Sequence, residues 1–225
     1  MKSIVTGGAG FIGSNLVDQL VHKGHKVIVI DNFSTGRRSN LSHHKKNNVK
    51  VITIDISKNN KLDKYFKNTN YIFHLAGLAD IVPSIISPKE YFQSNVKGTL
   101  NVLEASKKAR VKKLIYAASA SCYGIPKKYP TNEKSKIDPL YPYALSKFLG
   151  EQLVIHWAKT YKMPNVSLRF FNVYGPRSRT SGAYGAVFGV FLAQKLAREP
   201  LTIVGNGHQT RDFIHVYDLV KAIIK

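Results

Sequence analysis

Short apolar runs that alternate with longer segments of helical spacing constrain the fold of this chain more than any other feature. The runs are rich in β-branched and aromatic residues, and the segments between them repeat apolar residues every three or four positions. Runs that are apolar on both faces are typical of parallel strands covered by helices on each side. The sequence therefore predicts an α/β fold with a doubly wound parallel sheet of the Rossmann type. The predicted strands lie within residues 2–7, 25–31, 49–55, 70–77, 111–119 and 165–172.

The end of the chain follows a different pattern. Helices are predicted at 14–23, 91–109, 142–161 and 186–198. After residue 171 the alternation is replaced by a loop rich in Gly, Ser and Arg, and the final residues repeat a helical pattern without a capping signal. We expect a Rossmann domain over 1–171 and a smaller lobe over 172–225 that is incomplete.

Composition limits the kinds of function. No apolar run approaches the roughly 20 residues of a membrane helix, and the N-terminus lacks a signal-peptide pattern, so we expect a cytoplasmic protein. The single cysteine, Cys122, leaves no Cys cluster for a metal, and no metal is expected. The net charge is +21, but the lysines are scattered over predicted surface turns without interleaved aromatic residues. This pattern favours a lysine-rich surface over a nucleic-acid site.

The glycine-rich segment VTGGAGFIG lies between the first predicted strand and the first helix. Two residues separate Gly7 from Gly10 and Gly10 from Gly13. Counted from Gly8, the glycines also follow the dinucleotide-binding pattern Gly-x-Gly-x-x-Gly. Such a turn lets backbone N–H groups and the positive end of a helix face a pyrophosphate. Asp31 ends the next strand, where its carboxylate can accept hydrogen bonds from both ribose hydroxyls, which favours NAD over NADP. Arg37 and Arg38 follow closely and leave NADP open.

Two further strand ends carry candidate residues. Asp55 ends the third predicted strand, where it either meets an adenine amino group or caps the next segment. The segment HLAG puts small residues at the end of the fourth strand, where open α/β sheets hold their ligands. His74 in this segment is interpreted as a packed or hydrogen-bonded strand residue rather than a catalytic one.

Tyr143 and Lys147 lie four residues apart at the start of a predicted helix, so their side chains share one face. A nearby ammonium and a cationic nicotinamide ring both favour phenolate, which would lower the pKa of Tyr143 and make it a base. Ser119 ends the fifth predicted strand and could pass a proton between a substrate hydroxyl and Tyr143. Without the upstream glycine pattern, the same spacing would indicate packing alone.

The chain also carries, in order, the segments TGGAGFIG, DNFSTG, HLAG, SNVKGTLNVLEA, SASCYG, YALSK, RFFNVYGPR and TRDFIHV. This set resembles the extended short-chain dehydrogenase/reductase family, in its nucleotide-sugar epimerase branch, over essentially the whole chain. The resemblance implies tightly held NAD and inversion at C4 of a nucleotide-activated hexose, preferably a UDP-sugar, through a transient 4-keto sugar. Reduction, decarboxylation or 2-epimerisation of a nucleotide sugar, or a non-catalytic nucleotide-binding role, are the alternatives.

The same resemblance assigns roles to individual residues. The catalytic residues would be Ser119, Tyr143 and Lys147. The cofactor would contact Gly7, Gly10, Phe11, Ile12, Gly13, Asp31, Asn32, Asp55, Ile56, Leu75, Ala76, Gly77, Asn95, Tyr143, Lys147 and Phe170. The substrate would contact Ser119, Tyr143, Asn172 and Arg211, and residues 182–188 (GAYGAVF) would line its site. On this basis residues 1–171 bind NAD and carry the catalytic residues, and 172–225 form part of a sugar-nucleotide lobe.

Two further expectations follow from the resemblance. A 4,6-dehydratase is not expected, because Ala120 and Ser121 stand where dehydratases carry Asp and Glu. Family members commonly dimerise through two helices, here residues 94–108 and 146–161. The apolar stripe of the second helix, with Leu149, Leu153 and Trp157, favours a homodimer, and the alternative is that it only packs on the sheet.

Overall fold

The central element of the structure is a parallel sheet of six strands in the order β3-β2-β1-β4-β5-β6. The computed structural model describes residues 1–58, 62–178, 187–203 and 205–225. Each predicted run contains one strand of this sheet, which confirms the doubly wound parallel fold. The strands are β1 (Lys2–Thr6), β2 (Lys26–Asp31), β3 (Val49–Thr53), β4 (Tyr71–His74), β5 (Lys113–Ser119) and β6 (Asn165–Phe170).

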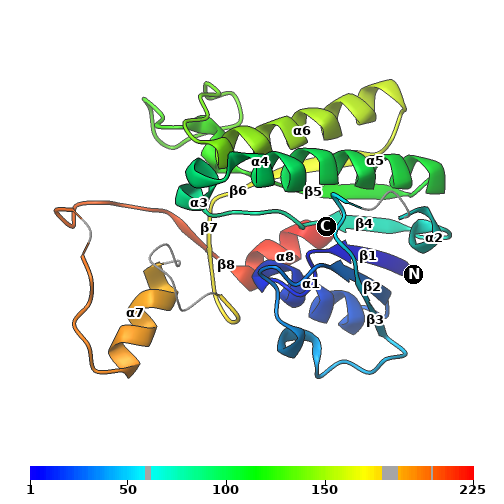
Figure 1. Ribbon diagram of the computed structural model, residues 1–225, viewed down its shortest axis with the longest axis horizontal. Helices are drawn as coiled ribbons and strands as arrows, with labels where there is room; N and C mark the ends of the chain where they lie inside the picture. Colours follow the sequence, from blue (N-terminus) through cyan, green and yellow to red (C-terminus); the bar gives the residue numbers. More distant parts are fainter. Residues whose placement is uncertain (59–61, 179–186, 204) are drawn as a thin grey trace.

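Helices cover both faces of this sheet (Figure 1). α1 (Phe11–His22) and α8 (Val216–Ile224) lie on one face, and α5 (Gly98–Ala109) and α6 (Pro142–Thr160) lie on the other. Each face has its own buried cluster, because the strands carry apolar side chains on both sides. Among the described residues, none of the helices has both the length and the apolarity to cross a lipid bilayer.

The predicted helices match the structure closely. The helix predicted at 14–23 is α1, which begins three residues earlier, and the helix predicted at 142–161 is α6. The segment predicted as one helix at 91–109 consists of α4 (Pro88–Phe92), a π-helical turn η2 (Gln93–Lys97) and α5. The remaining short elements are η1 (Arg38–Leu41), α2 (Asp63–Phe66), α3 (Ile81–Ile86) and η3 (Ala120–Tyr123).

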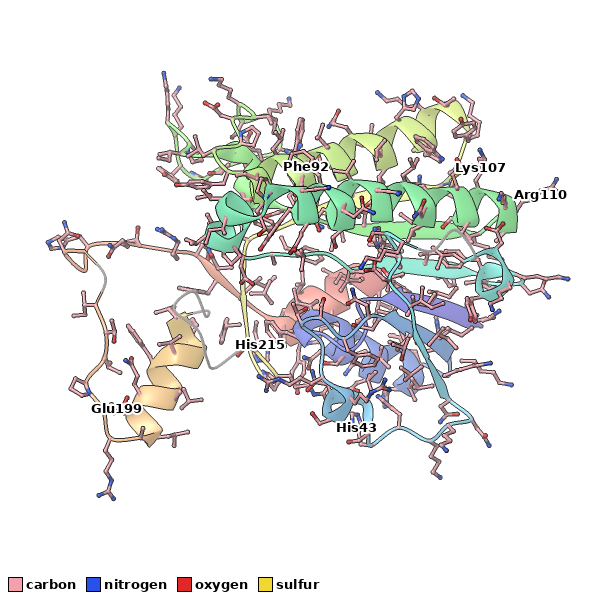
Figure 2. The ribbon with its side chains drawn as sticks, in the orientation of Figure 1. His43, Phe92, Lys107, Arg110, Glu199 and His215 are labelled. Atoms are coloured by element: carbon pink, nitrogen blue, oxygen red, sulfur yellow. The ribbon has the colours of Figure 1, made fainter. Side chains whose placement is uncertain are left out.

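A second, two-stranded parallel sheet pairs β7 (Asn172–Tyr174) with β8 (Phe213–His215). α7 (Val187–Leu196) corresponds to the helix predicted at 186–198 and stands apart from the main sheet, with Glu199 just beyond its end (Figure 2). The predicted boundary after residue 171 coincides with the change from one sheet to the other. α8 nevertheless packs against α1 and buries Val216, Leu219, Val220 and Ile223 in the core of the main sheet. The division into two domains stays a prediction.

The proposed dimer helices are partly used within the chain. Leu153 and Trp157 pack against the core cluster on the α5–α6 face, and the Trp157 indole N–H donates to Glu104 at 3.0 Å. Leu145 near the start of α6 is exposed. The contacts of Leu153 and Trp157 support the alternative that this stripe serves the chain's own core, and the homodimer stays a prediction.

Candidate active site

A cavity of about 380 Å³ lies at the carboxyl ends of β1, β2, β4, β5 and β6. This is the edge where open parallel sheets bind their ligands. With the exception of Asn95, every residue that the sequence assigns to catalysis or to the cofactor lines it. These lining residues are Gly7, Gly10, Phe11, Ile12, Gly13, Asp31, Asn32, Asp55, Ile56, Leu75, Ala76, Gly77, Ser119, Tyr143, Lys147 and Phe170.

The glycine turn between β1 and α1 is shaped to leave room for a ligand. Gly7 has a φ of +71°, and a Cβ there would lie 2.6 Å from the backbone nitrogen of Ala76. At Gly10, by contrast, a Cβ would meet only the Gly7 carbonyl oxygen, at 3.2 Å. Gly10 caps α1 without a side-chain hydrogen bond, so the first amides of the helix can receive an anion. The turn therefore fits a dinucleotide pyrophosphate.

Asp31 is held rigidly beside this turn. One carboxylate oxygen accepts the Ala9 N–H at 2.9 Å and the other accepts the Phe33 N–H at 2.8 Å. A carboxylate has about four lone-pair sites, so two remain for ribose hydroxyls. Neither Arg37 nor Arg38 lines the cavity, and the Arg38 guanidinium lies 4.2 Å from the centre of the Phe33 ring. The Asp31 carboxylate therefore lines the cavity, whereas the Arg37 and Arg38 side chains do not.

Asp55 caps the segment that follows β3. Its Oδ1 accepts from the Ser57 N–H at 2.9 Å and the Ser57 hydroxyl at 2.7 Å. Partial burial acts to raise the pKa of Asp55, but the hydrogen bonds from Ser57 and Asn32 outweigh it and hold the pKa below its ordinary value. The capping interpretation is confirmed. Because Asp55 also lines the cavity, its contact with an adenine amino group stays a prediction.

His74 is a buried, hydrogen-bonded strand residue, as the sequence predicted. Its Nδ1 lies 2.7 Å from the Thr6 hydroxyl and its Nε2 lies 2.9 Å from the Thr99 hydroxyl. Burial, together with the charge of Lys147, lowers the pKa of His74 to about 3. The ring is therefore neutral at ordinary pH and links β4 to β1 and α5.

Tyr143 and Ser119 meet at the far end of the cavity. The Tyr143 hydroxyl donates to Ser119 Oγ at 3.1 Å, and Ser119 Oγ lies 2.8 Å from Ser121 Oγ. Ser119 also caps η3, where its oxygen accepts the Ser121 N–H. Burial raises the pKa of Tyr143, and its hydrogen bonding with Ser119 and Ser121 opposes this only in part. The predicted lowering of this pKa, which includes the charge of the nicotinamide ring, stays a prediction for the protein with its cofactor.

Lys147 follows Tyr143 by one turn of α6 and is buried. Its ammonium nitrogen lies 4.4 Å from the centre of the Tyr116 ring. Burial lowers the pKa of Lys147 to about 7, although the nearby Glu151 carboxylate favours the charged form. The lysine can therefore change charge near neutral pH. Burial of this kind depends on residues far away in the sequence, so the Tyr-Lys spacing alone could not reveal it.

Asn95 lies beside the cavity instead of lining it. Its Oδ1 accepts the Leu78 N–H at 2.8 Å, and its Nδ2 donates to the Leu78 carbonyl at 3.0 Å and to Ser146 Oγ at 2.9 Å. These bonds join the loop after β4 to α6. Protein partners already use the Asn95 amide, and its contact with the cofactor stays a prediction.

The two predicted substrate residues beyond the main sheet, Asn172 and Arg211, do not line the cavity. Asn172 and Arg211 are exposed, and their side chains donate to the backbone carbonyls of Asp212 and Thr210. Of the predicted loop at 182–188, residues 182–186 lie outside the described residues. The structure therefore assembles the cofactor and catalytic side of the site, while the diphosphate-binding role of Asn172 and Arg211 stays a prediction.

Several lining residues were not found from the sequence. Ser34 and Thr35 line the cavity near Asp31, and the segment DNFSTG could have indicated them because their hydroxyls follow the ribose-side carboxylate directly. Ser94 and Val173 also contribute to the lining. Val173 belongs to β7, a strand of three residues that is too short for a periodic signal.

A glycine turn at a helix start, a buried carboxylate after the second strand and a Ser–Tyr–Lys group in one cavity define a dinucleotide-dependent enzyme. Residues 3–225 match the family described as the NAD dependent epimerase/dehydratase family. The chain belongs to this family, and NAD is its cofactor. This confirms the resemblance to the extended short-chain dehydrogenases and reductases.

Individual relatives cover more than one reaction. The chain is 36% identical over 221 residues to a putative UDP-glucose 4-epimerase of Methanocaldococcus jannaschii, covering 97% of this chain and 71% of the relative. It is 36% identical to UDP-glucuronic acid decarboxylase 4 of Arabidopsis thaliana, covering all of this chain and 50% of the relative. A similar structure is that of UDP-N-acetylglucosamine 4-epimerase from Methanobrevibacter ruminantium, in complex with UDP-N-acetylmuramic acid. Its TM-score is 0.95 at 38% identity, covering 99% of this chain and 71% of that one.

Proposed function

We propose that this protein inverts C4 of a UDP-hexose. The observation that carries the proposal is the hydrogen bond from Tyr143 to Ser119, in the same cavity as Lys147 and the glycine turn. The names of the similar proteins support it, since a 4-epimerase is found among both the relatives and the solved structures.

The cofactor half of the cavity has a defined task in this proposal. The open space at Gly10 and the amides at the start of α1 would hold the pyrophosphate, and Asp31 would accept from the adenosine ribose. Bound NAD⁺ supplies a positive charge and a reversible hydride exchange with C4 of the sugar. Tight binding of both partners keeps the reacting atoms in near-attack geometry.

Ser119 and Tyr143 form the proton path. In the free protein the Tyr143 hydroxyl donates to Ser119 Oγ, which adjoins Ser121 Oγ. Once Tyr143 is a phenolate the direction of this bond reverses: Ser119 donates its proton to Tyr143 and takes the proton of a substrate hydroxyl in its place. Because burial raises the pKa of Tyr143, the phenolate needs added positive charge in the cavity. We therefore infer that Tyr143 becomes a base when the cofactor is bound and remains a phenol in the free protein.

Lys147 would provide part of that charge. It lies on the same face of α6 as Tyr143 and lines the cavity. With its pKa lowered to about 7 by burial, the lysine carries a proton only in part of the molecules at neutral pH. A ribose hydroxyl that accepts from its ammonium would favour the charged form, and this couples cofactor binding to the electrostatics of the tyrosine.

The experiment is a substrate panel with NAD⁺ followed by ¹H and ¹³C NMR. UDP-glucose, UDP-N-acetylglucosamine and UDP-glucuronic acid are each incubated with the protein. The C4 proton is monitored by ¹H NMR and the C6 carbon by ¹³C NMR. We expect inversion at C4 of at least one sugar. Release of CO₂ from UDP-glucuronic acid without inversion would instead assign the protein to the decarboxylases, which are also among its relatives.

The control variants separate chemistry from binding. Tyr143→Phe removes the proton path and should lower turnover by roughly 10²–10⁴-fold, while NAD⁺ affinity changes by less than about twofold. Tyr141→Phe removes an exposed hydroxyl two residues earlier and should keep full activity. Full activity of Tyr143→Phe would refute the proposed mechanism.

A further inference from the structure

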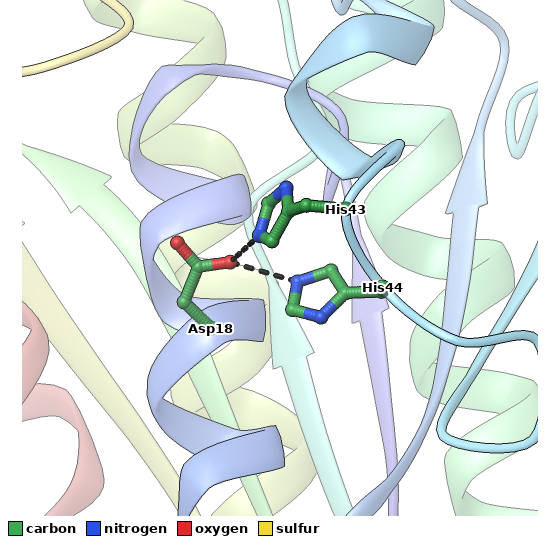
Figure 3. A group of neighbouring side chains, drawn as sticks. All are labelled: Asp18, His43 and His44. Carbon is green, nitrogen blue, oxygen red and sulfur yellow. Dashed lines mark hydrogen bonds and ion pairs between the residues drawn. The ribbon is translucent and has the colours of Figure 1, made fainter.

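A cluster of three metal-binding side chains lies outside the cavity, against α1. His43 and His44 follow η1, and Asp18 lies in the middle of α1 (Figure 3). The Nε2 atoms of His43 and His44 lie 2.9 Å and 2.7 Å from the same oxygen, Oδ1 of Asp18. The candidate ligand atoms of all three residues lie within 4.8 Å of one another. Figure 2 places His43 on the α1 side of the sheet, opposite Phe92 and Lys107.

We propose that Asp18, His43 and His44 bind one divalent transition-metal ion, of the kind that imidazole nitrogen suits, such as Zn²⁺, Co²⁺ or Ni²⁺. Two imidazoles and one carboxylate are a common protein set for such ions, with water at the open position. Ligand atoms around a tetrahedral zinc ion are roughly 3.3 Å apart, given bond lengths of about 2.0 Å. The present nitrogen–oxygen separations are slightly shorter, so the ion requires a small outward movement. The half-exposed His43 ring can make this movement more readily than the His44 ring, of which 9% is exposed.

The surroundings of the cluster are suited to this movement and to selectivity. The His43 side chain is 49% exposed, which leaves its ring free to adjust. Mg²⁺ and Ca²⁺ prefer all-oxygen sites, so a site with two imidazole ligands binds these ions poorly. A chain with a net charge of +21 does not collect divalent cations through its overall field. An ion found on it would therefore be held by specific coordination.

Arg177 serves as the outer partner of the carboxylate. Its Nη2 lies 2.7 Å from Oδ2 of Asp18, the oxygen that the histidines do not use. Such an outer hydrogen bond orients a ligating carboxylate and leaves its other oxygen for the ion. The positive charge of Arg177 weakens the attraction for a cation, which points to moderate affinity.

Binding would join parts of the chain that lie far apart in the sequence. The segment before the histidines is already attached to the glycine turn, because the Arg37 N–H and the Asn40 amide both donate to the Ala9 carbonyl, at 3.0 Å and 2.8 Å. An ion at Asp18 would fix the other end of this segment to α1. The ion would thus have a structural role and would raise the melting temperature by binding only the folded state.

The test is calorimetric titration of the untagged protein with ZnCl₂, NiCl₂ and MgCl₂, together with thermal melts. We expect one Zn²⁺ or Ni²⁺ per chain, no measurable Mg²⁺, and a melting temperature that rises with Zn²⁺. His43→Ala should weaken Zn²⁺ binding at least tenfold and abolish the thermal shift. Because His43 is half exposed, the variant is expected to fold, and circular dichroism checks this.

A matched variant and a spectroscopic signature complete the test. His156→Ala removes an exposed histidine from α6 and should bind Zn²⁺ like the wild type. With Cu²⁺ as the probe, paramagnetic resonance should show coupling to two nitrogens in the wild type and to one in His43→Ala. Unchanged Zn²⁺ affinity in His43→Ala, or binding lost equally in His156→Ala, would overturn the proposal and leave the cluster as an ion-paired surface contact.

Discussion

The two sheets of the molecule hold their functional side chains in different ways. In the six-stranded sheet, Arg169 of β6 donates to the Glu151 carboxylate at 2.6 Å and to the Tyr123 hydroxyl at 2.6 Å, and Glu151 is only 2% exposed. At the two-stranded sheet, Asn172 of β7 and Arg211, which lies just before β8, are exposed and donate to nearby backbone carbonyls. The first set is fixed by the interior, and the second lies against solvent.

Burial explains why the side chains of the main sheet are held in one position more strictly than those near the second sheet. A buried polar group must find a hydrogen-bond partner, and few arrangements satisfy several such groups at once. Lys147 is buried, and the Tyr143 hydroxyl and Ser119 Oγ are hydrogen-bonded to each other, so folding alone places these groups. An exposed side chain exchanges its bonds with water at little cost, so a ligand decides its position. The catalytic side of the cavity is therefore formed in advance, whereas a diphosphate side at Asn172 and Arg211 would form on binding.

The largest effect is expected at the glycine turn of the first region. A Cβ on Gly13 would overlap the Gly7 carbonyl oxygen and the Gly8 Cα, which are backbone atoms that cannot turn aside. Gly13→Ala should lower the free energy of unfolding by about 4 kcal/mol and abolish NAD binding. Urea denaturation and a cofactor titration measure the two effects.

Gly24→Ala is the matched control for this substitution. Gly24 has a φ of +77° but nothing within 4 Å of an added Cβ, so only backbone strain of about 1–2 kcal/mol is expected. NAD binding should remain. Equal losses in both variants would mean that the turn is no more constrained than an open loop, and the contrast between rigid and open regions would fail there.

A second prediction compares Arg169 of β6 with Arg211, which lies just before β8. Arg169→Leu leaves the Glu151 carboxylate buried without its cation, and should cost about 3 kcal/mol of unfolding free energy. Arg211→Ala removes an exposed side chain and should change stability by less than about 0.5 kcal/mol. Urea denaturation of the two variants measures the difference.

The pair Glu151→Leu with Arg169→Leu sharpens this comparison. Removing both charges should recover most of the stability lost in Arg169→Leu, because no unpaired ion then remains inside. If the double variant is less stable than the single one, the ion pair contributes packing or specificity beyond charge balance. If Arg211→Ala is as destabilising as Arg169→Leu, the residues around the two-stranded sheet are held as tightly as those of the main sheet.

The sequence predicted the first region well because its signals are local. The alternating runs predicted the strands and the parallel sheet, and the position of Asp31 and Ser119 at the ends of runs predicted that they lie at one edge of the sheet. The one-turn spacing of Tyr143 and Lys147 likewise survives in α6. These relationships depend on a few neighbouring residues and on the geometry of parallel strands.

The sequence could not predict properties that depend on distant packing. In the free protein the pKa of Tyr143 is raised because burial outweighs its hydrogen bonds. The Lys147 ammonium of α6 is desolvated beside Tyr116 of β5. The side-chain amide of Asn95 is hydrogen-bonded to Leu78 and Ser146, and no sequence motif predicted these bonds. The pairing of β7 with β8 joins three-residue strands about 40 positions apart, where periodicity carries no signal.

The smallest expected effect concerns the charge of Lys147. Burial lowers its pKa to about 7 in the folded state, against 10.5 as the ordinary value. Between these two values the unfolded chain binds a proton that the folded chain releases, so stability rises with pH by up to about 1.4 kcal/mol per unit. Lys147→Met removes this dependence. From pH 7.5 to 8.5 the wild type should gain about 1 kcal/mol relative to the variant, as measured by urea denaturation.

Lys195→Met supplies the control from the less constrained part of the molecule. Lys195 is exposed on α7, outside the main sheet, so its removal should leave the pH dependence of the wild type in place. Parallel stability curves for the wild type and Lys147→Met would show that Lys147 is solvated in the folded protein. The contrast between the two regions would then rest on hydrogen bonding alone, because burial would no longer set the charge at the catalytic end of the cavity.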